Sequence, residues 1–177
     1  MNSRLKYPVN ANDHIKGNKE ATLELVEYGD FQCSHCGEAY KIVKKIQKKM
    51  GDDLKFVFRN FPLAESHPYA YPAAQAAEAA AIQNKYWQMH DLLYEHQQQL
   101  EDTNLLGYAK TIGLDIAKFK TDYQSASTLA KIEQDFESGV ISGVNGTPSF
   151  FINGMKYQGD WRNEEEFIHY LKSALVS

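Results

Sequence analysis

Cysteine is scarce in this chain of 177 residues, which contains only two. Both lie in one four-residue segment, Cys33-Ser34-His35-Cys36. Two sulfur atoms so close in the sequence cannot build the cross-linked framework of a disulfide-stabilised scaffold. They can bond only to each other, to a metal or to a substrate, so this segment is the first candidate for chemistry in the chain.

The sequence also lacks long apolar runs and an excess of basic charge. No apolar run approaches the ~18 residues of a membrane span, and the N-terminus lacks the ~7–15-residue apolar stretch of a signal peptide. The net charge is -4, whereas a surface that binds nucleic acid or an anionic membrane is basic. We therefore predict no nucleic-acid partner, no membrane insertion and a cytoplasmic location. The location is periplasmic or otherwise extracytoplasmic if the chain is a processed mature form.

Apolar residues are plentiful by contrast, since 43% of the chain is hydrophobic and 24% is charged. A chain of ~150 residues buries roughly 68–70% of the surface that it exposes when unfolded, so a core without covalent cross-links is feasible. This balance excludes a disordered, collagen-like or coiled-coil chain. No repeat and no linker rich in Pro, Gly or Ser divides the sequence. We expect one soluble domain that is a monomer.

The first third of the chain has the pattern of a strand, a helix and a second strand. Residues 22–28 fit a short strand, and residues 54–61 fit another that Pro62 ends. Between them, apolar residues recur at helical spacing over residues 39–50, and Gly51 follows where a helix C-cap favours a left-handed residue. The cysteine pair thus lies where the first strand leads into the helix.

The rest of the chain changes character twice. Residues 66–139 are helical in composition and show no strand signal. Two short apolar runs then flank Asn153-Gly154, a pair that supplies the positive φ angles of a two-residue hairpin turn. Asn163 and Glu166 resemble the capping box of a closing helix. The expected parts are an α/β core in residues 12–64 and 141–177 and a helical insertion in residues 65–140.

The spacing of the cysteines favours redox chemistry. Sulfurs separated by two residues at the start of a helix can close a disulfide with little backbone movement. Cys33 is expected to sit exposed where free N–H groups and the helix dipole favour an anion, so it is the predicted nucleophile and Cys36 the buried resolving thiol. His35 would add a positive charge when protonated and a hydrogen-bond donor to the thiolate. Both effects lower the Cys33 pKa from ~8.5 into a range of about 3.5–7.5.

Two readings without redox chemistry compete for the same cysteines. A structural zinc site needs four ligands and usually a second paired motif, and the chain has no second cysteine pair. The histidines outside the motif show no strong metal spacing. Two inert buried cysteines are the other reading. We predict a redox-active pair, with no metal and no organic cofactor.

Two further segments decide little when taken alone. The proline of Gly146-Thr147-Pro148 can simply start a strand, since only ~5–6% of X-Pro bonds are cis. Trp87, His90 and Tyr94 recur at helical spacing, which fits a packed core better than contacts to a cofactor.

Taken together, these segments resemble a known family. They are EYGDFQCSHC (residues 27–36), YWQMHD (86–91) and GTPSFFING (146–154). In this order they look like the DsbA-like thiol–disulfide oxidoreductases of the thioredoxin superfamily, over about residues 12–175. The resemblance implies an α/β thioredoxin fold with an inserted all-helical domain, a cis peptide before Pro148, and packing of that proline loop against the cysteines.

The resemblance also assigns roles to single residues. Thr147 would offer its backbone to an extended substrate strand, and Pro148 and Phe31 would belong to the substrate-binding surface. Glu27, six residues before Cys33, matches the acidic residue that lies under the active site in this family and can handle the Cys36 proton. A solvent-facing position in the strand is an equal alternative for Glu27.

Ser34 is a departure from the family pattern, because the strongest oxidants of the family carry proline at this position. Serine loses the rigid φ of proline and adds a hydroxyl that can hydrogen-bond locally. His35 favours an oxidant, while the lack of a signal peptide favours a reductase or a cytosolic redox role. The direction of the reaction stays open.

The predicted function is thiol–disulfide exchange between the Cys33–Cys36 pair and protein or small-molecule thiols. A redox partner that the sequence does not identify must reset the pair after each cycle. The alternative from another class is a non-catalytic peptide-binding or chaperone module, which would use the groove beside Pro148 and make little use of the cysteines.

Overall fold

The computed structural model describes residues 3–175, which form one five-stranded sheet and seven α-helices. The sheet order is β1-β3-β2-β4-β5; β2 and β3 are parallel, and the other neighbours are antiparallel. The strands are β1 (His14–Gly17), β2 (Leu23–Gly29), β3 (Leu54–Asn60), β4 (Ser149–Ile152) and β5 (Met155–Lys156). The helices are α1 (Ser34–Met50), α2 (Ala70–Ile82), α3 (Tyr86–Glu95), α4 (Asp102–Thr111), α5 (Ile116–Tyr123), α6 (Ala126–Ile141) and α7 (Glu164–Leu175), with a 3-10 turn at Gly51–Asp53.

Local sequence signals explain several element ends. Helix α1 stops where Gly51 takes a positive φ of 54°, a conformation that a residue without Cβ adopts at little cost. The turn between β4 and β5 has positive φ at Asn153 (46°) and Gly154 (78°), so the predicted hairpin is confirmed. The side chain of Asn163 accepts the N–H of Glu166 at 3.2 Å at the start of α7.

Strand β1 is the element that the sequence pattern missed. It is only four residues long, lies at an edge of the sheet and has no fully buried residue, so it carries little apolar pattern. Strand β2 departs from the expected alternation for the opposite reason. Every residue of β2 except Glu24 is buried, because this strand is central and both of its faces are covered.

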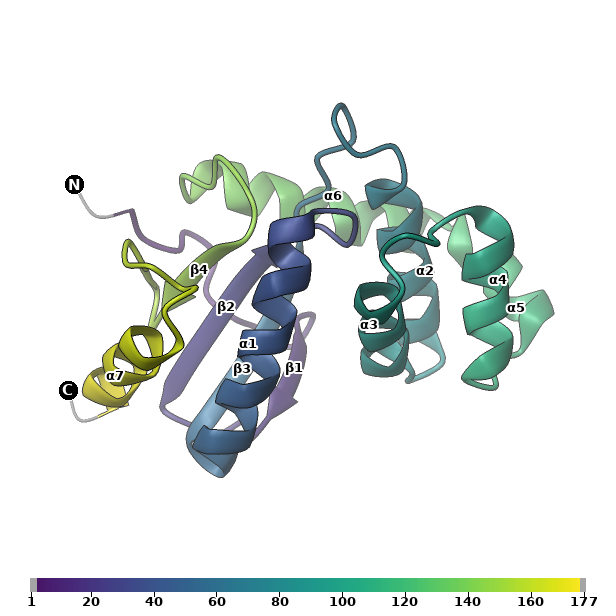
Figure 1. Cartoon of the computed structure of the whole chain (residues 1–177). Helices are drawn as coiled ribbons and strands as arrows, with labels where there is room; N and C mark the ends of the chain where they lie inside the picture. Colours follow the sequence, from purple (N-terminus) through teal and green to yellow (C-terminus); the bar gives the residue numbers. More distant parts are fainter. Residues whose placement is uncertain (1–2, 176–177) are drawn as a thin grey trace.

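Helices cover both faces of the sheet (Figure 1). On one face, side chains such as Leu25, Phe56 and Phe150 belong to a buried cluster with residues of α1, α3 and α7. On the other face, Tyr28 and Phe151 belong to a second cluster that Phe136 of α6 packs against. Alternate residues of β2 therefore serve two cores, which places Glu27 on the same face as Leu25, toward α1 and α3.

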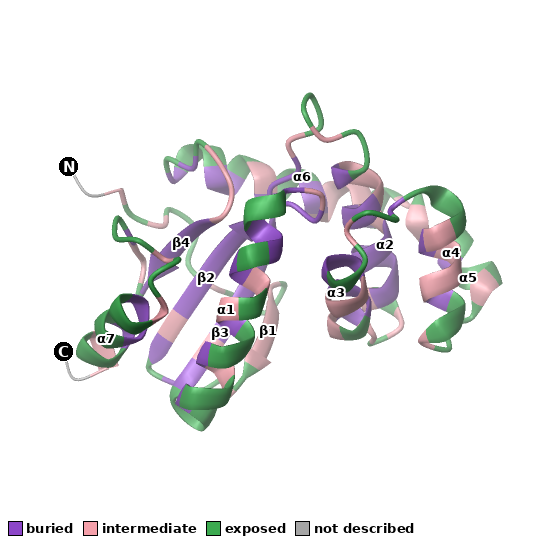
Figure 2. Cartoon of the chain, viewed as in Figure 1, coloured by how far each residue is buried: buried purple, intermediate pink, exposed green. Residues whose placement is uncertain are grey.

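The helical part of the chain is built around α2, which Figure 2 shows as largely buried, whereas α4 and α5 are more exposed. Helix α2 contacts α3, α4, α5 and α6. Alanines supply most of its buried surface, and their small side chains let several helices approach at once. Within residues 3–175, no helix combines the length and the apolar character that a membrane span needs. The division of the chain at residues 65 and 140 remains a prediction.

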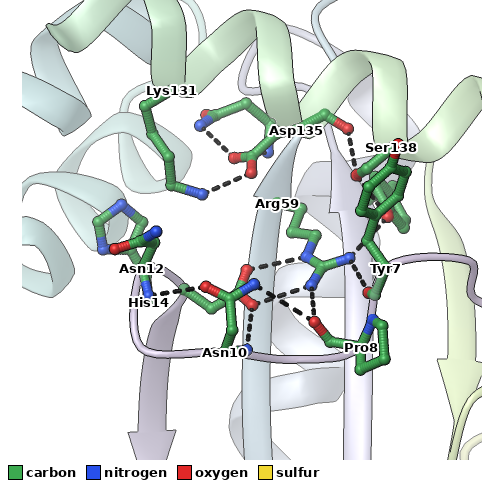
Figure 3. A network of polar contacts seen from close by, with 12 residues as sticks. Tyr7, Pro8, Asn10, Asn12, His14, Arg59, Lys131, Asp135 and Ser138 are labelled. Carbon is green, nitrogen blue, oxygen red and sulfur yellow. Dashed lines mark hydrogen bonds and ion pairs between the residues drawn. The ribbon is translucent and has the colours of Figure 1, made fainter.

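A buried arginine ties the N-terminal segment to the sheet (Figure 3). Arg59 of β3 forms a two-point ion pair with Asp13, at 2.8 and 2.9 Å, with 3% of each side chain exposed. Its remaining N–H groups donate to the carbonyl oxygens of Tyr7 and Pro8 and to the Tyr28 hydroxyl. All five guanidinium donors are therefore used, as a buried arginine requires.

A second polar network joins the sheet to the helical part. The side chain of Asn60 donates to Glu78 of α2 at 2.7 Å and to Asp135 of α6 at 3.0 Å. His14 of β1 contacts the same Glu78 at 2.8 Å. Lys131 pairs with Asp135, as Figure 3 shows. Because the carboxylates of Glu78 and Asp135 are buried and each has several of these partners, the network fixes how the helices dock on the sheet.

Both edges of the sheet are covered within the same chain. On the β1 side, the indole of Trp87 donates to the carbonyl oxygen of Ile15 at 3.1 Å. On the β5 side, Arg4 forms a bridge with Met155, and the N-terminal segment exchanges backbone hydrogen bonds of 2.8 and 2.9 Å with this edge.

Candidate active site

The two cysteines lie where β2 leads into α1, as the sequence predicts. Cys33 is the N-cap residue of α1, and Cys36 lies in its first turn and is fully buried. The exposed position expected for Cys33 is wrong, because only 6% of the residue is accessible. Its sulfur lies 3.6 Å from the carbonyl oxygen of Thr147, so the proline loop partly covers it.

The surroundings of Cys33 favour its thiolate. A hydrogen bond from the Cys36 thiol makes the largest contribution and outweighs burial, which opposes ionisation. Thr147 and the backbone N–H groups of Cys36 and His35 also favour the charged form. Together they lower the pKa of Cys33 to about 5, within the range expected from the sequence.

The ring of His35 does not play the expected part. It is exposed, and its Nδ1 accepts a hydrogen bond of 2.7 Å from Arg162 instead of donating to Cys33. Arg162 also donates to Glu38 at 3.0 Å and stacks on Trp161, so it holds the ring on the outer face of α1. His35 thus favours the thiolate through its backbone N–H rather than through its imidazole.

Ser34 is exposed at the first helical position, between the two sulfurs in the sequence. Its side chain therefore faces solvent and not the buried side of the motif.

Glu27 lies in the interior, and the solvent-facing alternative for it is wrong. Only 2% of this residue is exposed, because β2 is central and α1 covers this face. Burial, and then the negative charge of Cys33, raise the pKa of Glu27 to about 8. Burial, the Cys33 thiolate and Glu27 in turn raise the pKa of Cys36 well above its ordinary value. At neutral pH both the Glu27 carboxyl group and the Cys36 thiol therefore hold protons, and the charge of Glu27 affects the ionisation of Cys36.

The proline loop lies beside the cysteines. The peptide bond between Thr147 and Pro148 is cis, as the resemblance implies. A hollow of about 320 Å³ adjoins the loop, and its walls include the loop backbone, Tyr157, Gln158 and Trp161. Thr147 and Pro148 are half-buried, so the loop remains accessible from this hollow.

Phe31 cannot contact a substrate, so its assignment to the binding surface is wrong. The residue is 1% exposed, and its ring packs 5.2 Å from the ring of Phe58 and 5.0 Å from that of Tyr94. An aromatic side chain at the end of a central strand is drawn into the core, where it supports the loop from beneath.

Asp30 is a site residue that sequence reasoning missed. One carboxylate oxygen accepts the N–H groups of Gln32 (2.7 Å) and Cys33 (3.2 Å), and the other accepts the N–H of Leu63 (2.9 Å) and contacts His67 (2.8 Å). Asp30 therefore holds the backbone that leads into α1. An aspartate three residues before an N-cap is typical of such turns and was a usable signal.

Gln97 was also missed, and no local pattern could have found it. Its side-chain N–H₂ donates to the carbonyl oxygens of Phe31 (2.8 Å) and Cys33 (2.9 Å), 66 and 64 residues earlier in the chain. The segment between α3 and α4 thus holds the active-site loop from the helical side. Within residues 3–175, no group of three or more Asp, Glu, His or Cys side chains is arranged to hold a metal ion.

Comparison with known proteins identifies the family. The sequence profile of the thioredoxin family matches residues 9–172. The chain therefore belongs to the thioredoxin family, and the cysteine pair, cis proline and sheet order described above are consistent with this.

Solved structures with the same fold include DsbA-type proteins. BdbD from Bacillus subtilis superimposes with a TM-score of 0.86 over 100% of both chains, at 21% identity. A thioredoxin-like oxidoreductase from Silicibacter pomeroyi has a TM-score of 0.80 at 25% identity and covers 93% of this chain and 94% of its own. α-DsbA1 from Wolbachia pipientis has a TM-score of 0.81 at 22% identity, over 97% and 94%. The DsbA-like fold with helices inserted in a thioredoxin core is therefore confirmed.

The curated relatives are much longer proteins. Residues of this chain are 40% identical over 161 positions to a protein of Salinispora arenicola named Na(+)/H(+) antiporter NhaA 1, and 41% identical over 151 positions to one of the same name from Mycolicibacterium vanbaalenii. The matches cover 90% and 84% of this chain but 24% of each relative. The chain thus spans about a quarter of the length of these relatives.

Proposed function

We propose that this chain exchanges disulfides with protein substrates, with Cys33 as the attacking or attacked sulfur and Cys36 as the resolving thiol. The observation that carries the proposal is the contrast between the two cysteines. The pKa of Cys33 is lowered to about 5, whereas that of Cys36 is raised well above its ordinary value. At neutral pH one sulfur is a thiolate nucleophile and the other keeps its proton until the second step.

Each half of the exchange moves two electrons. When a substrate is oxidised, its thiolate attacks the Cys33 sulfur, the Cys33–Cys36 bond breaks, and Cys36 leaves as a thiolate that takes a proton from Glu27. A second substrate thiolate then attacks the substrate sulfur of the mixed disulfide, forms the substrate disulfide and releases the Cys33 thiolate. Reduction of a substrate runs through the same steps in reverse. Because its pKa of about 8 keeps Glu27 protonated at neutral pH, Glu27 first releases its own proton and then accepts the proton of Cys36.

The stabilised thiolate favours the oxidising direction. At pH 7, a pKa about two units below ambient pH stabilises the reduced form by about 2.7 kcal/mol. For a two-electron couple this makes the disulfide more oxidising by roughly 60 mV. We therefore propose that the pair donates its disulfide and that a partner oxidises it again.

The proline loop supplies the substrate contact in this proposal. An extended substrate segment would pair with the backbone of Thr147, beside the Cys33 sulfur, and lie in the adjoining hollow. Backbone pairing suits a protein that must accept many sequences, because it requires no particular side chain. The ion transport named for the longer relatives is no part of this proposal.

Alkylation of the reduced protein tests the nucleophile. We expect the rate of modification by iodoacetamide to rise with pH through a midpoint near 5 and to disappear in Cys33→Ser. In Cys36→Ala the midpoint should move upward, because this variant removes the largest stabiliser of the thiolate. A midpoint near 8.5 in the wild-type protein would contradict an activated Cys33.

A second experiment separates exchange from peptide binding. Oxidised protein is mixed with a reduced, unfolded protein, and the free thiols of the unfolded protein are counted after the two are separated. We expect the unfolded protein to lose about two thiols per oxidised molecule, while Cys33 and Cys36 gain two, and we expect no loss with Cys33→Ala. If Cys33→Ala kept full function in cells and bound the unfolded protein as tightly as the wild type, the peptide-binding alternative would replace the proposal.

A further inference from the structure

A small cavity lies next to Glu27, on the face of the sheet that α1 and α3 cover. The space in which the centre of a water molecule can lie is about 10 Å³. This is near the minimum that one water needs. Glu27 of β2 lines it together with His90 and Tyr94 of α3. Lys44 of α1 and Asp91 of α3 line its other end, nearer the surface.

Three buried polar atoms around this cavity have no hydrogen-bond partner in the part of the chain that the structure describes. They are Oε1 of Glu27, Nε2 of His90 and the hydroxyl of Tyr94, on residues that are 2%, 4% and 6% exposed. Buried polar atoms in native proteins almost always have partners, and a buried water typically makes about three hydrogen bonds. The number and chemistry of these atoms therefore match a single water, which would accept from Tyr94 and donate to Glu27 and His90.

His90 is held in the tautomer that this arrangement needs. Its Nδ1 lies 3.0 Å from a carboxylate oxygen of Asp91, so Nδ1 carries the proton and Nε2 is left as an acceptor. Burial lowers the pKa of His90, which keeps the ring neutral. The other oxygen of Asp91 accepts from Lys44 at 2.9 Å and from Lys16 at 3.4 Å, two lysines that solvent reaches.

The cross-strand neighbours of Glu27 in the sheet cannot exchange a proton with it. Its cross-strand neighbours are Phe58 on β3 and Phe150 on β4, and both are buried apolar residues. The titratable groups that face the cavity from the surrounding elements are Lys16 (β1), Glu27 (β2), Tyr40 and Lys44 (α1), and His90, Asp91 and Tyr94 (α3). Of these, the contacts from His90 through Asp91 form a continuous path to the surface.

We propose that this cavity binds one ordered water, and that the water, His90 and Asp91 carry protons between Glu27 and the surface during disulfide exchange. The proposal rests on the proposed function, because that function makes Glu27 gain and lose a proton in each cycle. His90 acts through Glu27 and touches no reacting sulfur, so it is a positioning residue for proton transfer and not a catalytic residue.

The proton balance closes over one cycle. Before Cys36 ionises, Glu27 passes its own proton through the water to Nε2 of His90, and the Nδ1 proton leaves through Asp91; the ionised Glu27 then takes the proton of Cys36. When a Cys36 thiolate takes a proton from Glu27, a proton enters through Asp91 to Nδ1, and the Nε2 proton returns through the water. The two halves of the exchange thus restore the starting tautomer of His90, and no other co-reactant is needed.

A double-mutant cycle tests the relay. In single-turnover exchange at pH 7, we expect His90→Phe to slow the step that moves the Cys36 proton by roughly tenfold, less than the ~10²–10⁴-fold of a direct proton acceptor. In a Glu27→Gln background, His90→Phe should slow the step less than about twofold, since the relay acts through Glu27. An equal slowing in both backgrounds would show a structural role and overturn the proposal.

Controls keep this test decisive. Tyr86→Phe removes a neighbouring buried hydroxyl that does not line the cavity, and it should leave the step unchanged. If His90→Phe does not fold, Asp91→Asn interrupts the same path and is expected to slow the same step, again only when Glu27 is present. No slowing by Asp91→Asn would contradict the relay.

A readout without redox chemistry separates this proposal from the proposed function. A high-resolution crystal structure of the reduced protein should show one water within hydrogen-bond distance of Glu27 Oε1 and His90 Nε2, and a dry cavity would overturn the proposal. Failure of the proposed function would appear instead as a wild-type protein that exchanges no thiols. Failure of the relay alone would appear as normal exchange that His90→Phe leaves unchanged.

Discussion

At the scale of single residues, the pKa of Cys33 depends most on Cys36, the residue with which it would form the disulfide. The hydrogen bond from Cys36 lowers the pKa of Cys33 more than any other contact, and the negative charge of Cys33 raises the pKa of both Cys36 and Glu27. The three groups therefore titrate as a coupled set, in which one negative charge is favoured at the outermost sulfur. This arrangement keeps the reduced pair ready for reaction without exposing either sulfur fully.

His35→Ala should change the reactivity of Cys33 little. The variant keeps the backbone N–H that favours the thiolate and removes a ring that Arg162 holds away from the sulfur. We expect the alkylation midpoint of Cys33 to shift by less than about one pH unit, since a protonated ring beside the thiolate would contribute one unit or more. A larger upward shift would mean that the ring turns toward Cys33 in solution.

Glu27→Gln should make the stability of the reduced protein less sensitive to pH. The pKa of Glu27 is raised from 4.5 to about 8 on folding, so the folded state binds the proton more tightly and wild-type stability falls as pH rises through this window. At pH 7 the raised pKa of Glu27 lowers the free energy of unfolding by roughly 3 kcal/mol relative to acid pH, and glutamine removes this cost. Urea denaturation at pH 4.5 and 7.5 measures the effect, and parallel stability changes in both proteins would contradict it.

At the scale of elements, the start of α1 is held from two sides by contacts that the helix itself does not supply. Asp30 caps the preceding loop, and Gln97 binds the carbonyl groups of the same loop from the helical part of the chain. The side chain of Cys33 makes no capping hydrogen bond, so these contacts, which bind the loop before the helix, fix where the helix starts.

Asp30→Ala should destabilise the protein and disorganise the active-site loop. It leaves the N–H groups of Gln32 and Leu63 without their acceptor, while the N–H of Cys33 keeps the carbonyl oxygen of residue 30 at 3.1 Å, and we expect a loss of about 3 kcal/mol in the free energy of unfolding. Asp53→Ala is the matched control, because Asp53 is exposed and its loss should cost less than about 0.5 kcal/mol. Equal urea midpoints for the two variants would contradict this role of Asp30.

Local sequence patterns predicted the elements whose signals are local. Strands β2 and β3, helix α1 and the hairpin at Asn153 follow from apolar spacing and turn residues that lie close together in the chain. The cysteine pair was found for the same reason. Strand β1 escaped because its stability comes from pairing with β3 and not from its own four residues.

Contacts between distant residues account for the errors in the site. The ring of His35 is turned away by Arg162, 127 residues later, and Gln97 reaches the active-site loop across 64 residues. Phe31 and Glu27 were misplaced or left open because burial on a central strand depends on which helices cover it. Single-sequence patterns hold no record of such pairings.

The whole molecule should unfold as one unit, although helices interrupt its sheet-forming segments. Asn60 joins β3 to α2 and α6 through buried hydrogen bonds, so neither part keeps its polar groups partnered without the other. The chain has two tryptophans that report on the two parts, Trp87 in α3 and Trp161 before α7.

Single-tryptophan variants test this cooperativity. In Trp161→Phe the fluorescence follows Trp87, where α3 meets β1 and β3, and in Trp87→Phe it follows Trp161, beside Phe150 of β4. We expect each variant to give the same urea midpoint by fluorescence and by far-ultraviolet circular dichroism, as two-state unfolding requires. A fluorescence transition that precedes or follows the circular dichroism transition would show that the helical part and the sheet unfold separately.

The contacts at the two sheet edges have a consequence for the proposed exchange with protein substrates. Exposed strand edges recruit other strands, and reduced substrates are rich in segments that could add to them. Here Trp87 engages the carbonyl of Ile15 at one edge, and residues 3–5 pair with Met155 and its neighbours at the other. In the proposed function, these contacts would leave few free backbone groups at the sheet edges to which a substrate segment could add a strand.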